Sequence, residues 1–138
     1  MIIHLKDLTS IISSPQTIWR ITKDLLEAED KIDQDKEHFW VFHLNCQNKI
    51  NLIELVSLGT LNASIVHPRE VFTRAVGERS ANIIVVHNHP SGALDPSEED
   101  IVITKRLAEA GKLLGIELMD HLIVTLTGFI SFKEKELI

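Results

Sequence analysis

The distribution of apolar and polar residues predicts that this chain contains both strands and helices. Short apolar runs rich in β-branched and aromatic residues are typical of strands, and they cover residues 39–45, 50–58, 81–86, 121–125 and 129–132. Apolar residues at helical spacing follow Pro15, Pro68 and Ser97, and Gly115 is placed to end the third helix. We therefore expect an α/β fold in which 81–86 is a buried central strand covered on both faces.

The chain has the size and composition of one compact domain preceded by a short extension. Its 138 residues are 44% hydrophobic, which is enough for a substantial core. Residues 1–36 predict an N-terminal helical extension whose amphipathic helix packs on the sheet or on a partner, and residues 37–138 form the main domain. The acidic segment Glu27 to Asp35 is interpreted as a solvated connection.

The most informative segment follows the central strand and contains two histidines and a carboxylate. Strand side chains alternate between faces, so His87 and His89 point the same way and Asn88 points the opposite way. A Pro- and Gly-containing loop then leads to a helix, which places Asp100 in the first helical turn. Two nitrogen ligands and one oxygen ligand, with a fourth position left to water, are typical of catalytic zinc.

Each of these residues also has an ordinary structural interpretation. Ser97 and Asp100 have the spacing of a capping box, in which the two residues close the start of a helix. A single histidine near a strand end is usually a hydrogen-bonded structural residue. The complete string His-x-His-Pro-x6-Ser-x-x-Asp fixes five identities in one register, and this combination favours the metal site.

That string resembles the JAMM metalloprotease motif of JAB/MPN domains. Within this superfamily the chain is most similar to the RadC DNA-repair-protein family, from about Glu37 to Lys135. The motifs that carry this similarity are His87-Asn88-His89-Pro90-Ser91-Gly92, Gly59-Thr60-Leu61-Asn62, His67-Pro68-Arg69-Glu70-Val71 and Asp120-His121. The resemblance implies a three-layer α/β/α sandwich with a mixed central sheet of the cytidine-deaminase-like type.

The resemblance also implies roles for individual residues. His87, His89 and Asp100 would bind one zinc ion per chain, and Ser97 would form a hydrogen bond near the metal-bound water or the substrate oxyanion. A glutamate at the start of an early strand would act as general base. Glu37 fits that position best.

Alternatives to Glu37 remain open at this stage. Glu54 lies within a later strand pattern, and Glu70 lies in the first turn of the helix after Pro68. Glu37 itself has a structural interpretation as a solvated charge that ends the acidic segment.

The other histidines and the single cysteine are interpreted as structural. His121, next to Asp120, either orients a metal ligand or forms a hydrogen bond at a strand end, and we favour the strand end. His43 and His67 have no partner at a suitable spacing. Cys46 lies in a turn and cannot form an internal disulfide, because it is the only cysteine.

The implied function is zinc-dependent hydrolysis of amide or isopeptide bonds in a protein or peptide substrate, in a DNA-repair setting. The alternative is a noncatalytic protein-binding module of a repair or replication assembly. A net charge of −6 disfavours direct contact with nucleic acid. The Pro-Cys-x-x-Cys ligands of zinc deaminases are absent, and the letters His87-Asn88-His89 do not make an HNH nuclease, whose functional residues are dispersed.

Location and partners are expected from composition alone. No apolar stretch approaches the length of a membrane span, and the first residues lack the pattern of a signal peptide, so we expect a cytoplasmic protein. Exposed strand edges favour a homodimer. The loops at 59–67 and 90–96 are expected to select the substrate, but they carry no readable specificity code.

Overall fold

The structure is a computed structural model that describes residues 2–3, 12, 14–59 and 66–138. The motif residues Thr60, Leu61 and Asn62, and most of the expected specificity loop at 59–67, lie outside the described part. In chain order the elements are β1 (Ile2–Ile3), α1 (Pro15–Glu27), α2 (Lys31–Gln34), β2 (Glu37–Leu44), β3 (Ile50–Gly59), α3 (Pro68–Gly77), β4 (Asn82–Asn88), α4 (Glu98–Leu114), β5 (Glu117–Val124) and β6 (Phe129–Ser131).

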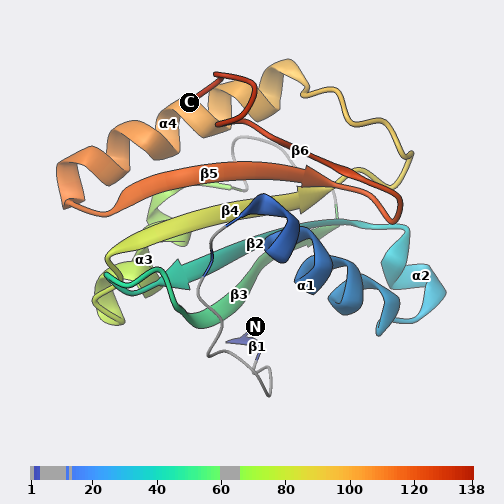
Figure 1. The fold of residues 1–138 in the computed structure, drawn as a ribbon, viewed down its shortest axis with the longest axis horizontal. Helices are drawn as coiled ribbons and strands as arrows, with labels where there is room; N and C mark the ends of the chain where they lie inside the picture. Colours follow the sequence, from blue (N-terminus) through green and yellow to red (C-terminus); the bar gives the residue numbers. More distant parts are fainter. Residues whose placement is uncertain (1, 4–11, 13, 60–65) are drawn as a thin grey trace.

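Six strands form one mixed sheet in the order β1-β3-β2-β4-β5-β6 (Figure 1). The pair β4 and β5 is parallel, and the other neighbouring strands are antiparallel. Parallel neighbours need a long crossover, and here the crossover contains α4. The predicted α/β fold with a mixed central sheet is confirmed.

Helices cover both faces of the sheet and divide the core in two. Strand β2 shows the division, because Trp40 and Phe42 pack on the side of α1, whereas Phe39 and Val41 pack on the side of α3 and α4. Figure 1 shows α1 in front of the sheet and α4 running along β5. Ile18 of α1 is fully buried against the sheet, so the predicted amphipathic helix does pack there.

The acidic segment Glu27 to Asp35 is mostly exposed, as expected of a solvated connection, but it is also locally ordered. It contains α2, and the carboxylate of Glu29 lies 2.6 Å from Nε2 of His38, a side chain with no exposed surface. The structural role of Glu29 depends on a partner nine residues away, and no local pattern indicates it.

Among the described helices, none is long and apolar enough to cross a membrane.

Candidate metal centre

Strand β4 and the residue after it bring two imidazoles to the same face of the sheet. His87 pairs with Phe39 of β2, and its side chain therefore faces the core under α4. The pairing continues one residue further, because the backbone N–H of His89 donates to the carbonyl of Val124 at 3.0 Å. The predicted alternation is confirmed by Asn88, whose amide oxygen accepts from the backbone N–H of His38 instead.

The first turn of α4 supplies the carboxylate. Ser97 Oγ accepts from the backbone N–H of Asp100 at 3.1 Å, and Asp100 Oδ2 accepts from the backbone N–H of Ser97 at 2.8 Å. This is the predicted capping box. The same carboxylate faces the histidines, so capping and proximity to the imidazoles are compatible in one residue.

The three side chains converge at distances that suit one small cation. His87 Nε2 lies 3.0 Å from His89 Nε2 and 3.1 Å from Asp100 Oδ1, and His89 Nε2 lies 3.3 Å from Asp100 Oδ2. Zinc bonds to nitrogen and oxygen of about 2.0–2.1 Å, in a tetrahedral arrangement, put neighbouring ligand atoms about 3.3 Å apart. The residues present therefore fit a zinc ion.

Hydrogen bonds on the outer side of each imidazole orient its inner nitrogen. His89 Nδ1 donates to the carbonyl of Ala93 at 2.7 Å, which leaves the lone pair of a neutral ring on Nε2. His87 Nδ1 lies 2.7 Å from Nε2 of His121, so its outer nitrogen is also paired. Metal-binding histidines are held in this way, with the second ring nitrogen bonded to a protein group.

The electrostatics of the cluster favour a positive charge at its centre. Burial opposes ionisation of Asp100, but hydrogen bonds from His87 and His89 outweigh it and hold the pKa of the carboxyl well below its usual range. The hydrogen bond with Asp100 in turn raises the pKa of His89, against the effect of burial. When no metal is bound, a proton on the imidazoles supplies this positive charge. A metal ion must therefore compete with that proton.

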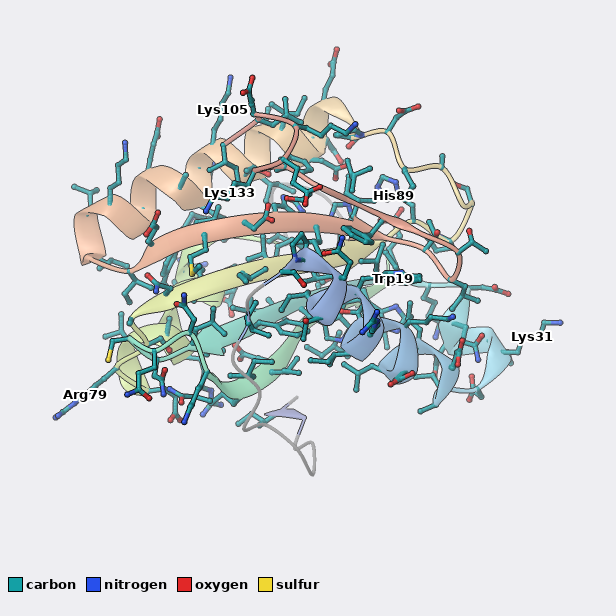
Figure 2. The ribbon with its side chains drawn as sticks, viewed as in Figure 1. Trp19, Lys31, Arg79, His89, Lys105 and Lys133 are labelled. Atoms are coloured by element: carbon teal, nitrogen blue, oxygen red, sulfur yellow. The ribbon has the colours of Figure 1, made fainter. Side chains whose placement is uncertain are left out.

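Glu37 lies in the hollow beside this cluster. The hollow is open, has a volume of about 730 Å³, and is lined by Glu37, Gly59, His89 and residues of the loop before α4. Figure 2 shows His89 beside that loop, where β4 leads toward α4. The carboxylate of Glu37 is close enough to raise the pKa of His89. Its role as a general base stays a prediction.

The two alternative glutamates lie elsewhere. The carboxylate of Glu54 is 3.4 Å from His43 and 3.9 Å from Arg74 of α3. Glu70 lines a separate hollow together with Glu54 and Arg74. Of the three glutamates considered from the sequence, only Glu37 therefore shares a hollow with a histidine of the cluster.

His121 has a different environment from the one that we favoured. Strand β5 begins four residues earlier than predicted, so Asp120 and His121 lie inside it. Asp120 accepts from backbone N–H groups, including that of His121, whereas the His121 ring contacts His87 and Thr104. The favoured interpretation, a hydrogen bond at a strand end, therefore holds for the side chain of Asp120 but not for the His121 ring. Sequence reasoning missed Thr104, although its position four residues after Asp100 on the same helix was a usable signal.

The cap formed by His67 agrees with its structural interpretation, whereas the interpretation of Cys46 stays a prediction. His67 Nδ1 accepts from the backbone N–H of Arg69 and so caps α3, and Cys46 is exposed.

Comparison with known proteins identifies the family. Residues 12–137 match the family model of the RadC-like JAB domain. The chain belongs to this family. The match begins before residue 37, so it also includes α1 and α2.

Three UPF0758 proteins are about half identical in sequence to this chain. A UPF0758 protein of Desulforamulus reducens is 47% identical over 133 residues, which are 95% of this chain and 59% of the relative. A UPF0758 protein of Geobacillus kaustophilus is 54% identical over 107 residues, or 78% of this chain and 47% of the relative. One of Methanosarcina mazei is 47% identical over 90% of this chain and 52% of its own length. The chain thus spans roughly half the length of these relatives.

Proposed function

We propose that this RadC-like domain is a zinc-dependent hydrolase of amide or isopeptide bonds in a protein or peptide. The observation that carries the proposal is the convergence of two imidazole nitrogens and one carboxylate within 3.0–3.3 Å, beside a hollow that also contains Glu37. Three protein ligands next to an open hollow leave room for water and substrate, as catalytic zinc sites require.

Each residue of the site would have a different role in hydrolysis. His87, His89 and Asp100 would hold the zinc ion, which when bound lowers the pKa of water to about 7 and polarises a carbonyl group. Glu37 would accept a proton from water and deliver it to the leaving nitrogen. Ser97 would donate its hydroxyl proton to the substrate oxyanion, because its oxygen already accepts from the backbone N–H of Asp100.

The biological setting is part of the proposal. The RadC family name supports a role in DNA repair, but the net charge of −6 disfavours strong binding to a phosphate backbone. A protein or peptide substrate therefore suits this domain better than DNA does.

The first test is the zinc content of the purified protein by elemental analysis, after dialysis against a weak chelator. We expect about one zinc per chain in the wild type and a loss of zinc in His89→Ala. His67→Ala is the matched control, because His67 caps α3 outside the cluster and should leave the zinc content unchanged.

The second step of the test is hydrolysis. The zinc-loaded protein is incubated with a peptide library that includes lysine-linked isopeptides, and new amines are detected by mass spectrometry. Cleavage that depends on His89 supports the proposal. A folded wild type that binds no zinc, or a zinc-loaded one that cleaves no amide, would favour the noncatalytic protein-binding module instead.

A further inference from the structure

A chain of buried polar groups leads from His87 back to the helix that carries Asp100. His87 Nδ1 lies 2.7 Å from His121 Nε2, and His121 Nδ1 lies 2.5 Å from the hydroxyl oxygen of Thr104. The Thr104 hydroxyl donates to the carbonyl oxygen of Asp100 at 2.7 Å. All four residues are buried, so every donor and acceptor in this chain needs a partner within the protein.

The positions of the protons follow from the Asp100 carbonyl, at one end of this series of hydrogen bonds. The carbonyl oxygen of Asp100 can only accept, so the single hydroxyl proton of Thr104 points toward it. The Thr104 oxygen must then accept from Nδ1–H of His121. Since a neutral imidazole carries one N–H, the Nε2 of His121 is left with a lone pair.

The lone pair on His121 Nε2 determines which nitrogen of His87 carries the proton. His121 Nε2 can only accept, so His87 Nδ1 carries the proton that is shared between the two rings. When the ring is neutral, as metal binding requires, the other nitrogen of His87, Nε2, has a lone pair that points at His89 and Asp100. The hydroxyl of one threonine therefore sets which nitrogen of His87 is free to bind a metal.

Aromatic packing prevents His121 from reversing this assignment by turning its ring. Phe132 stacks on His121 with ring centroids 4.4 Å apart, and Phe39 contacts it edge-on at 6.1 Å. The His121 side chain has no exposed surface, and its backbone N–H is held by Asp120. A ring flip would need these neighbours to move.

We propose that Thr104 and His121 are positioning residues that hold His87 in the tautomer whose Nε2 binds the metal. This inference rests on the proposed metal site but not on hydrolysis. The same turn of α4 supplies the carboxylate of Asp100 and the carbonyl that orients Thr104. The position of the helix and the tautomer of His87 are therefore coupled.

The test compares Thr104→Val with Thr104→Ser, using zinc alone as the probe. Valine keeps the shape of threonine but removes the hydroxyl, whereas serine keeps the hydroxyl. We expect Thr104→Val to bind zinc about 10–100-fold more weakly than the wild type, in competition with a chelator at fixed pH. Thr104→Ser should restore wild-type affinity. A purely structural role would lower the unfolding free energy of the zinc-free protein in Thr104→Val without changing zinc affinity.

The tautomer itself can be measured in the wild type, so the inference stays testable if a variant fails to fold. Long-range proton–nitrogen spectra of the zinc-loaded protein should show His121 protonated at Nδ1 and not at Nε2. Protonation at Nε2, or equal zinc affinity in Thr104→Val and the wild type, would overturn the positioning role alone. A wild type that binds no zinc would overturn the proposed metal site as well.

Discussion

Two clusters of histidine and carboxylate lie at opposite ends of the same sheet face. At one end His87 meets His89 and Asp100, and at the other His43 meets Glu54. Both His43 and His87 extend from neighbouring strands toward the helices α3 and α4, and both are almost completely buried. The two clusters therefore contain similar residues in similar positions on the sheet face.

The clusters differ in how their polar atoms are paired. Within the described residues, His43 Nε2 and Glu54 Oε1 are buried without a hydrogen-bond partner, although they are 3.4 Å apart. Burial, helped by the nearby charge of Arg74, lowers the pKa of His43 to about 4, and burial raises the pKa of Glu54. Both groups thus tend toward their neutral forms.

The candidate metal centre shows the opposite behaviour because hydrogen bonds hold its outer atoms. Hydrogen bonds hold Asp100 as a carboxylate, and the outer nitrogens of His87 and His89 each have a partner. A buried histidine beside a carboxylate is therefore not enough to attract a cation. The pair also needs neighbours that direct the lone pairs inward.

The largest expected difference between the two ends of the sheet concerns catalytic turnover. Glu37→Gln should keep its zinc and lose about 10²–10⁴-fold in turnover, because the amide cannot accept the proton from water. Glu54→Gln is the matched control at the other end of the sheet and should cleave at the wild-type rate. The measurement is kcat on a substrate found by the library screen, with zinc content determined in parallel. Undiminished turnover in Glu37→Gln would remove Glu37 from the mechanism.

Zinc should stabilise the fold through one cluster and not the other. At a free zinc concentration of 100 times Kd, binding contributes about 2.7 kcal/mol to the unfolding free energy, or roughly 10 °C in Tm for a domain of this size. Asp100→Asn should lose this increase, whereas His43→Gln should keep it. Thermal unfolding with zinc and with a chelator measures both. A similar loss in the two variants would contradict a single metal site.

The His43 end should instead make stability depend on pH. Its pKa is lowered from 6.5 to about 4, so the unfolded chain binds the proton more tightly, and stability present above pH 6.5 is lost as the pH falls toward 4. The full loss is about 3 kcal/mol. His43→Gln should reduce it in denaturant titrations of the zinc-free protein. Glu54 acts in the opposite sense, because its raised pKa favours the folded state at lower pH. An identical pH slope in wild type and variant would contradict a neutral, buried His43.

The convergence of His87, His89 and Asp100 could be predicted from the sequence because their geometry is local. Strand alternation puts His87 and His89 on one face, and a short loop followed by a capping box returns Asp100 to them. The sequence needed no distant contact to indicate these three residues. Their convergence in the structure confirms that the motif describes a compact arrangement.

The supporting contacts were not predictable because they depend on strand register. Sequence alone does not show that β5 places His121 beside Val85 of β4, with its ring against His87. The pairing of β2 with β3 contains two irregularities, after Phe39 and after His43, and Glu54 lies between them opposite Val41. A shift of one residue would move each side chain to the other face of the sheet.

The smallest expected effect on stability comes from the serines near the two clusters. Ser97→Ala removes the side-chain cap of α4 and should lower the unfolding free energy of the zinc-free protein by about 1 kcal/mol. Zinc should still bind, because the backbone N–H of Ser97 continues to hold Asp100 Oδ2. Ser97→Thr should restore the cap.

The matched control is Ser80→Ala at the other end, where the hydroxyl lies 3.3 Å from His43 Nδ1 and its loss should leave zinc affinity and turnover unchanged. Turnover separates the two roles of Ser97. If the hydroxyl donates to the substrate oxyanion, Ser97→Ala should lose about 100-fold in kcat while zinc is retained. If turnover follows zinc content alone, Ser97 acts only as a helix cap, and the metal centre then differs from the His43 cluster by its ligands and Glu37 alone.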